Sequence, residues 1–445
     1  MNGTSTTVHK MGVMQLTLLT VVNMMGSGII LLPSKLAQVG TISITSWIVT
    51  ALGSLALAYA FAKCGRFNRK AGGMGGYAEY AFGKSGNFLA NYTYGVSLLI
   101  ANVAIAITAV GYLQAFFGWQ LSSLAVSLAT IAVLWVTTVP NFGGARVTGK
   151  IGAVTVWGII LPVVGISLIG WFWFDAEMYA SAWNPHNVGT MSAVSSSISI
   201  TLWAFLGLES ACANSEAVEN PERTVPIAVL AATVGVAIVY IASTNVVAGI
   251  VPNAELAASS APFGLAFAKI MSPVAGQVVI ALMIVACLGS LLGWQFTVGQ
   301  VFKSSSDVGY FVRLFGIATK TGTPVIGMLI LALVQTALAL MTTSPSLTEQ
   351  FNVLVNLAVV TNLVPYILSM SALAVMMKTY GVTSREFLLS LSVAFVGNIY
   401  SFYALFSSGQ QAMFWGSLVT FFGWLLYGTV SYKFDLARNR EQQDS

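Results

Sequence analysis

The chain has 445 residues, of which 56% are hydrophobic and only 7% carry a charge. Soluble domains contain about 25% charged residues, so this composition excludes a soluble enzyme and indicates a protein surrounded by lipid. The formal charge of +5 does not indicate nucleic-acid binding, because the basic residues stand singly or in small groups between apolar runs.

Apolar runs of about 20 residues, long enough to cross roughly 30 Å of hydrocarbon, recur along the whole sequence. The polar segment up to Lys10 has no apolar core followed by a small-residue cleavage site, so we expect no cleaved signal peptide. The runs and their breaks predict twelve transmembrane helices. Their bounds are about 13–33, 43–65, 86–116, 121–140, 152–174, 195–213, 225–250, 276–303, 324–342, 351–377, 386–407 and 412–432.

The positions of the basic residues predict the orientation of these helices. With a cytoplasmic N-terminus, all but two of the 19 Lys and Arg residues fall in inner loops and tails. The two on the outer side are Lys35 and Lys269. Cytoplasmic loops of membrane proteins carry an excess of Lys and Arg, so we expect both termini in the cytoplasm.

Two of the predicted spans contain residues that weaken a helix in mid-membrane. The first contains Gly26-Ser27-Gly28, and the sixth places Gly207 and Glu209 in an otherwise apolar run. A glycine pair alone is typical of close helix packing, whereas interruptions at corresponding positions of two halves indicate an inverted-repeat transporter.

The expected fold is therefore an all-α membrane protein with a five-plus-five inverted repeat, discontinuous helices 1 and 6, and two appended C-terminal helices. The expected parts are a tail at 1–12, repeats at 13–174 and 195–377, the last two helices at 386–432, and a tail at 433–445.

Glu209 is the acidic residue that lies well inside a predicted span. A carboxylate at the bilayer centre costs at least a few kcal/mol, so it needs a cation, a proton or a hydrogen bond to a neighbouring helix. Trp203, near the second break, and Trp294, in the eighth span, offer aromatic faces that attract ammonium groups, although such residues also serve packing. Asn102 suits a substrate contact and an interhelical hydrogen bond equally. Together these residues predict a cavity for an amine or a zwitterion, formed beside Gly26, Ser27 and Gly28.

Other patterns give no support for enzymatic chemistry. The segment Gly72–Tyr80 lacks the Gly-Lys-Ser/Thr ending of a phosphate-binding loop, so we interpret it as a tight turn or an inner gate. His9 and His186 lie in polar flanks on opposite sides. The three cysteines are far apart in sequence: Cys64, Cys212 and Cys287. We expect no metal site, no cofactor, no disulfide and no catalytic residue.

Several segments resemble hallmarks of the amino acid, polyamine and organocation transporter superfamily: Gly26–Ile29, Gly72–Tyr80 and Glu219–Pro226. The likeness covers nearly the whole chain and is greatest to the bacterial putrescine-ornithine antiporters of the basic amino acid and polyamine antiporter family. It is carried by Tyr77–Asn91, Leu202–Asn214, Ser290–Tyr310 and Gln350–Met370.

This resemblance implies exchange of cytoplasmic putrescine for external ornithine across a bacterial inner membrane, and also proton-coupled uptake of putrescine. A cytoplasmic ornithine decarboxylase is the implied functional partner. The resemblance assigns substrate binding to Trp203, Glu209 and Trp294, and putrescine handling to Cys64, Tyr92 and Tyr427. It links the inner segment with Lys303 and Tyr310 to exchange.

The residues themselves leave other cationic pairs open, such as lysine with cadaverine or arginine with agmatine. A channel or a membrane receptor would need a continuous polar stripe or a sizeable exposed domain, and neither is visible in the sequence. A membrane enzyme would need several polar residues converging on one site, which a single buried carboxylate does not provide.

Overall fold

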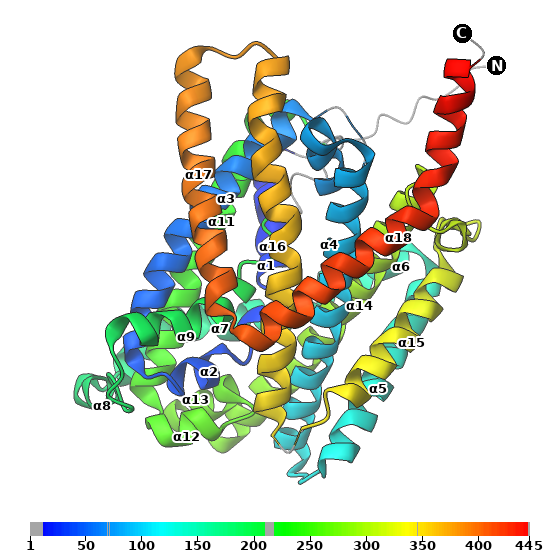
Figure 1. Ribbon diagram of the computed structural model, residues 1–445. Helices are drawn as coiled ribbons and strands as arrows, with labels where there is room; N and C mark the ends of the chain where they lie inside the picture. The colour runs from blue at the N-terminus through cyan, green and yellow to red at the C-terminus, as the bar shows by residue number, and fades with distance from the viewer. Residues whose placement is uncertain (1–11, 69, 71, 210–217, 345, 444–445) are drawn as a thin grey trace, which may run out of the picture.

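The computed structural model describes residues 12–68, 70, 72–209, 218–344 and 346–443. The side chains of residues 27, 221, 348 and 433–443 lie outside this description. Every regular element in the described residues is helical (Figure 1), which confirms the all-α class.

Nine helical stretches of the described chain are long and apolar enough to cross a membrane. They comprise α3 (Ile44–Phe67), α4 (Met74–Phe117), α5 (Ser123–Thr138), α6 (Ala145–Thr155) with α7 (Trp157–Ile169), α11 (Pro221–Ile250), α14 (Pro273–Asp307), α16 (Leu347–Thr379), α17 (Ser384–Ser407) and α18 (Gln410–Gln443). Two shorter apolar helices are α1 (Val13–Met24) and α15 (Val325–Met341). The remaining α-helices are α2 (Leu32–Ala37), α8 (Ala176–Ser181), α9 (Thr190–Trp203), α12 (Asn253–Ala258) and α13 (Pro262–Ile270).

The break predicted near Gly26 is present. Helix α1 ends at Met24, a short 3₁₀ turn, η1, covers Ser27–Ile29, and α2 starts only at Leu32. Backbone groups released by a break inside a membrane need other partners. The hydroxyl of Tyr240 on α11 donates to the carbonyl of Met24 at 2.7 Å, and the hydroxyl of Tyr112 on α4 donates to the carbonyl of Ile30 at 3.1 Å.

A second break lies where the sequence predicted it. Helix α9 ends at Trp203, and residues 204–209 form turns. The two breaks touch each other at glycines. A Cβ atom added to Gly28 would lie 3.3 Å from the Cα atom of Ala204, and one added to Gly207 would lie 3.0 Å from the carbonyl oxygen of Asn23. The backbone at Gly207 has φ +109°, a conformation that favours glycine.

Three boundaries differ clearly from the prediction. One is the end of α18, which continues to Gln443 through most of the predicted tail at 433–445. Helix α4 begins at Met74, earlier than residue 86, and contains a kink at Gly83 with φ 63°. It follows a turn in which Gly72 and Gly73 both have positive φ. The predicted turn is thus limited to the start of the glycine-rich segment, because its residues from Met74 to Tyr80 are helical. The fifth span divides into α6 and α7 around Val156.

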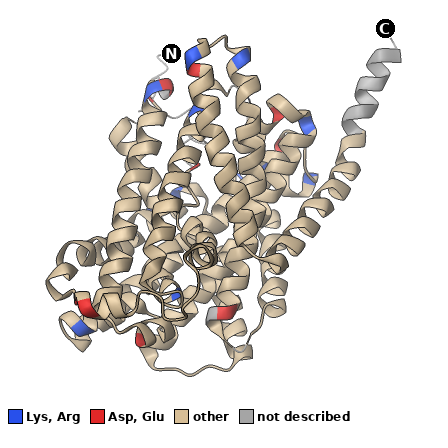
Figure 2. Cartoon of the chain, turned by 60° about the vertical axis from the view of Figure 1, so that its left-hand side comes forward, with Lys and Arg blue, Asp and Glu red and all other residues tan. Residues whose placement is uncertain are grey.

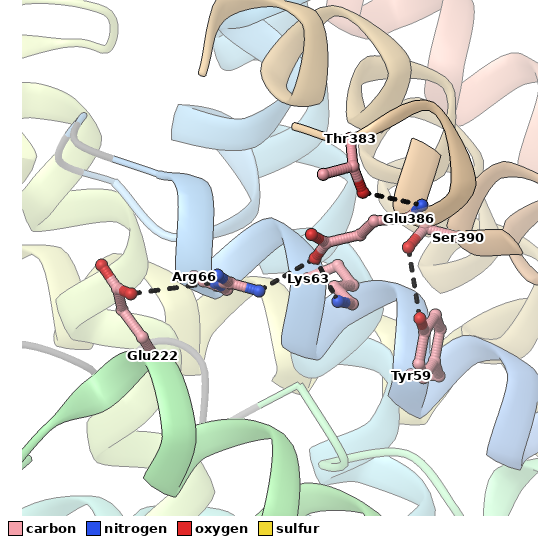
Figure 3. A network of polar contacts seen from close by, with 7 residues as sticks. All are labelled: Tyr59, Lys63, Arg66, Glu222, Thr383, Glu386 and Ser390. Atoms are coloured by element: carbon pink, nitrogen blue, oxygen red, sulfur yellow. Dashed lines mark hydrogen bonds and ion pairs between the residues drawn. The ribbon is translucent and has the colours of Figure 1, made fainter. Parts of the chain in front are cut away.

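Charged side chains tie three helices together at one end of the molecule (Figure 3). Glu386, in the first turn of α17, accepts from Lys63 Nζ at 2.7 Å and from Arg66 Nη1 at 2.9 Å, both on α3. Arg66 Nε lies 3.9 Å from the carboxylate of Glu222 near the start of α11. The hydroxyl of Thr383 caps α17 by accepting from the N–H of Glu386 at 3.3 Å.

Most Lys and Arg residues gather at this same end (Figure 2). At the other end, Lys269 of α13 pairs with Glu255 of α12 at 2.8 Å. Lys35 of α2 is only 2% exposed, and its Nζ atom lies 5.2 Å from the centre of the Phe351 ring. We refer to the two ends as the basic end and the opposite end.

The middle of the molecule is built around α4 and α16, which pack along each other (Figure 1). Large apolar side chains stay exposed on the peripheral α17 and α18, among them Phe395, Phe406 and Leu425. Such exposure suits contact with lipid, where apolar side chains need not be covered by protein. Glu209 and Asn362, in contrast, are buried at the chamber between the two breaks.

Candidate functional site

A small chamber of about 40 Å³ lies where the two broken helices meet. Its walls include Gly26, Gly28, Trp203, Glu209, Trp294 and Asn362. A larger cavity of about 670 Å³, the vestibule, reaches from Glu209 and Trp294 to Lys70 and Gly72 in the loop between α3 and α4. The chamber and the vestibule share Asn23, Gly26, Glu209 and Trp294. Glu209 therefore stands at the inner end of a path from the basic end.

Three donors hold the buried carboxylate of Glu209, which is 5% exposed. The hydroxyl of Tyr94 on α4 donates to Oε1 at 2.9 Å, and the hydroxyl of Tyr366 on α16 donates to Oε2 at 2.5 Å. The N–H of Gly207 donates to Oε2 at 3.0 Å. Hydrogen bonds to a charged acceptor are stronger than neutral ones and offset part of the cost of burial. An ammonium group arriving in the cavity can replace a tyrosine donor at this carboxylate.

Aromatic rings form the walls beside Glu209. The indole of Trp203 is 6% exposed, and its Nε1 atom has no hydrogen-bond partner among the described residues. Its ring meets Phe351 of α16 edge to face, with 6.5 Å between centroids. Lys35 also packs on Phe351, so the Phe351 ring links Trp203 at the chamber wall to Lys35 on α2. The indole of Trp294 lines the chamber and the vestibule.

Two predicted site residues lie behind the cavity walls. Asn102 is fully buried, and its Nδ2 atom donates to Oε1 of Gln295 at 3.2 Å. Cys64 Sγ on α3 donates to the carbonyl oxygen of Ser369 on α16 at 3.5 Å. Neither residue lines the chamber or the vestibule, so their roles stay predictions. The side chain of Ser27 and the whole of Cys212 lie outside the described residues.

The residues assigned by resemblance to putrescine handling and exchange lie closer to the basic end. The Phe88 ring stacks on Tyr92 at 5.8 Å and packs against Tyr427 at 5.3 Å between centroids. Lys303 forms an ion pair with Asp307 one turn further along α14.

Tyr310 lies in the turn after α14. Burial raises the pKa of its hydroxyl, and the nearby Glu79 carboxylate and Tyr427 raise this pKa further. The hydroxyl of Tyr310 therefore stays neutral at physiological pH and keeps its proton.

The sequence analysis did not predict that Tyr94 and Tyr366 contact Glu209, nor that Asn362 belongs to the site. Tyr94 and Tyr366 bind the carboxylate of Glu209, and Asn362 lines the chamber. The available signal was a polar pair, Asn362 and Tyr366, one helical turn apart within an apolar run. Among the described residues, no three His, Cys, Asp or Glu side chains lie close enough to hold a metal ion.

Residues 11–430 match the amino acid permease family. The chain is 67% identical over 428 residues to the putrescine transporter PotE of Escherichia coli (strain K12), covering 96% of this chain and 98% of that protein. It is 64% identical over 430 residues to PotE of Haemophilus influenzae, with 97% and 99% covered. The cadaverine/lysine antiporter of Escherichia coli (strain K12) is 36% identical over 409 residues, with 90% of each chain covered. The chain therefore belongs to the amino acid permease family and is a membrane transporter, not an enzyme.

Proposed function

We propose that this protein exchanges putrescine for ornithine across a bacterial inner membrane, exporting the diamine. The observation that carries the proposal is the position of Glu209, a buried carboxylate at the point where a deep cavity reaches both helix breaks. Identities of 67% and 64% to two transporters named for putrescine, against 36% to a cadaverine/lysine antiporter, favour the four-carbon diamine.

Both substrates suit the same site. Each has an ammonium group at the end of a short alkyl chain, and Glu209 would bind that group in place of a tyrosine donor. The faces of Trp203 and Trp294 would cover the methylene groups and attract the charge. Ornithine adds a carboxylate, for which the N–H groups released after Gly26 are suitable donors.

The proposed architecture has twelve spans, with two inverted repeats at 13–174 and 195–377. The broken elements α1 and α9 would begin corresponding halves, and their mutual contact at Gly28 and Gly207 supports this pairing. We assign the basic end to the cytoplasm because positive charge is retained on that side. Both termini would then be cytoplasmic, and the vestibule would open inward.

Transport would proceed by alternating access. The chamber shares walls with the vestibule, and we propose that Trp203, Phe351 and Lys35, which contact one another in turn, form the gate on the opposite side. Putrescine leaves with a charge of about +2 and ornithine enters with about +1 at neutral pH, so each cycle moves one positive charge outward. The protein would also take up putrescine with a proton, and a cytoplasmic ornithine decarboxylase would supply the exported diamine.

The test is uptake of labelled putrescine and labelled ornithine into proteoliposomes. The vesicles are preloaded with putrescine, ornithine, lysine, cadaverine or buffer, each with and without an imposed membrane potential. We expect acceleration by internal putrescine or ornithine, and a change in rate when the potential is reversed.

Each alternative has its own outcome. Equal acceleration by lysine and cadaverine would contradict the proposed substrates while leaving the transporter assignment in place. Potential-driven uptake of labelled ornithine into vesicles without internal amine would contradict exchange and indicate a uniporter, because proton-coupled entry is proposed for putrescine alone.

A further inference from the structure

We infer that Asn362 of α16 determines substrate specificity by binding the polar group at the end of the substrate that Glu209 does not hold. The inference rests on the proposed function, because it takes putrescine and ornithine as the substrates. It starts from an amide that lines the chamber, is 1% exposed, and has no hydrogen bond at Nδ2 or Oδ1 within the described part of the chain.

The residues one turn before and one turn after Asn362 on α16 make polar contacts. Ala358, Asn362 and Tyr366 are spaced one turn apart along α16, and of these three Asn362 lines the chamber. The carbonyl of Ala358 accepts from Ser97 Oγ at 3.0 Å, and Tyr366 donates to Glu209. Asn362 lies between them. The Tyr366 hydroxyl lies near the amide, but no hydrogen bond joins them.

Leaving a buried amide without partners is costly, because the group loses its hydrogen bonds to water and gains none. A residue kept in this condition beside a cavity is suited to a ligand that completes its hydrogen bonds. Trp203 Nε1, another unpartnered polar atom, also lines this chamber.

The chemistry of an amide fits an exchanger of two unlike head groups. Oδ1 accepts from an ammonium group, and Nδ2 donates to a carboxylate. Glu209 offers only acceptors when ionised, and Trp203 offers only a donor. Asn23 and Ser97 also line the chamber, but each already has a polar partner. The Asn362 amide can therefore bind the second ammonium of putrescine and, in the other half of the cycle, the carboxylate of ornithine.

Asn362→Leu and Asn362→Asp test this role in reconstituted full-length protein. The measured quantity is the concentration of unlabelled putrescine, 1-aminobutane or ornithine that halves exchange uptake of labelled putrescine. With Asn362→Leu, we expect the affinity for putrescine to fall about tenfold, because one hydrogen bond to a charged group is lost. The affinity for 1-aminobutane should change by less than about twofold, because the monoamine has no second ammonium.

Asn362→Asp keeps the size of the side chain and decides the question if the leucine variant does not fold. We expect ornithine to lose affinity relative to putrescine, because its carboxylate meets an acidic group instead of an N–H donor. Asn141→Leu is the matched control, since the Asn141 amide is buried but bonded to Thr148 and Leu292. This control should lower thermal stability and leave the ratios of the three affinities unchanged.

The outcomes separate this role from the proposed function. Parallel losses for putrescine, 1-aminobutane and ornithine in both variants, or no loss in either, would overturn the role of Asn362 alone. Wild-type vesicles that exchange neither putrescine nor ornithine would overturn the proposed function, and the assignment of Asn362 with it.

Discussion

At the scale of single residues, the carboxylate of Glu209 is the feature on which transport should depend most. Its oxygens accept from Tyr94, Tyr366 and Gly207. Glu209→Gln keeps the shape of the side chain and removes the negative charge that would attract an ammonium group. We expect the affinity for putrescine to fall about tenfold to a hundredfold, because this is the effect of losing a hydrogen bond between charged groups. The measurement is binding of labelled putrescine to purified protein.

A matched substitution, Glu255→Gln, removes a carboxylate that pairs with Lys269 at the opposite end. It should leave putrescine binding unchanged. If Glu209→Gln also binds putrescine normally in folded protein, the carboxylate is a structural group held by tyrosines and not an ammonium ligand.

Sequence was informative about Glu209 and much less so about its partners. A carboxylate inside an apolar run is costly enough to indicate a function from composition alone. Tyr94 and Tyr366 are 115 and 157 residues away from it in sequence, and tyrosine is common in membrane helices for other reasons. Only the packing of α4 and α16 brings the two hydroxyls to one carboxylate.

At the scale of elements, the contact between the two breaks depends on glycine. Gly207→Ala would force a side chain onto a backbone with φ +109° and bring a Cβ atom to 3.0 Å from the Asn23 carbonyl oxygen. We expect a loss of about 1–3 kcal/mol in stability, because backbone in this region is strained for residues other than glycine. A lower melting temperature in detergent, accompanied by slower exchange, is the expected observation.

Gly235→Ala is the control for this substitution. Gly235 lies within α11, and a Cβ atom there would meet nothing within 4 Å. Alanine is the better helix former, so the melting temperature should stay the same or rise. A Gly207→Ala protein as stable and active as Gly235→Ala would show that the turn at residues 204–209 does not need its glycine.

The sequence predicted at this scale which segments form helices, whereas it predicted less well where those helices begin and end. Apolar runs indicated the spans, and the glycines near residues 26 and 207 indicated both breaks. The sequence did not predict the early start of α4 at Met74. The first turns of this helix are rich in glycine and contain Glu79 and Lys84, a composition typical of a loop. The division between α6 and α7 falls at Val156, close to Gly152, Gly158 and Pro162. These residues weaken a helix, but they are spread over several positions and did not mark where the division lies.

At the scale of the whole molecule, the vestibule should be reachable from one side of the membrane. Thr297 lies on its wall, and Ala254 is exposed on α12 at the opposite end. In inside-out vesicles, a membrane-impermeant maleimide should label Thr297→Cys above the level of unmodified protein, and putrescine should slow this labelling. Ala254→Cys should react only in right-side-out vesicles.

The native thiols at Cys64 and Cys287 are buried, which keeps the background reaction of the described part of the chain low. Labelling of Thr297→Cys from the outer side alone would contradict the assignment of the basic end to the cytoplasm. Equal labelling from both sides would indicate that the protein samples both orientations of the cavity in vesicles.

The fold class at this scale follows from composition, because 7% charged residues cannot cover a soluble surface of this size. The shape of the cavity does not follow from composition. It depends on which side chains meet across α3, α4, α14 and the two breaks, and these contacts join segments far apart in sequence.

The depth of the vestibule also has a pharmacological consequence. Its volume of about 670 Å³ far exceeds what a four-carbon diamine fills, so a diamine with an apolar tail would extend from Glu209 along the vestibule wall. Such a compound would act as a wedge, because the walls could not approach each other while the tail lay between them. It would arrest turnover from the face at which the vestibule opens, whereas a compound confined to the other face could bind only after the cavity had opened to that face.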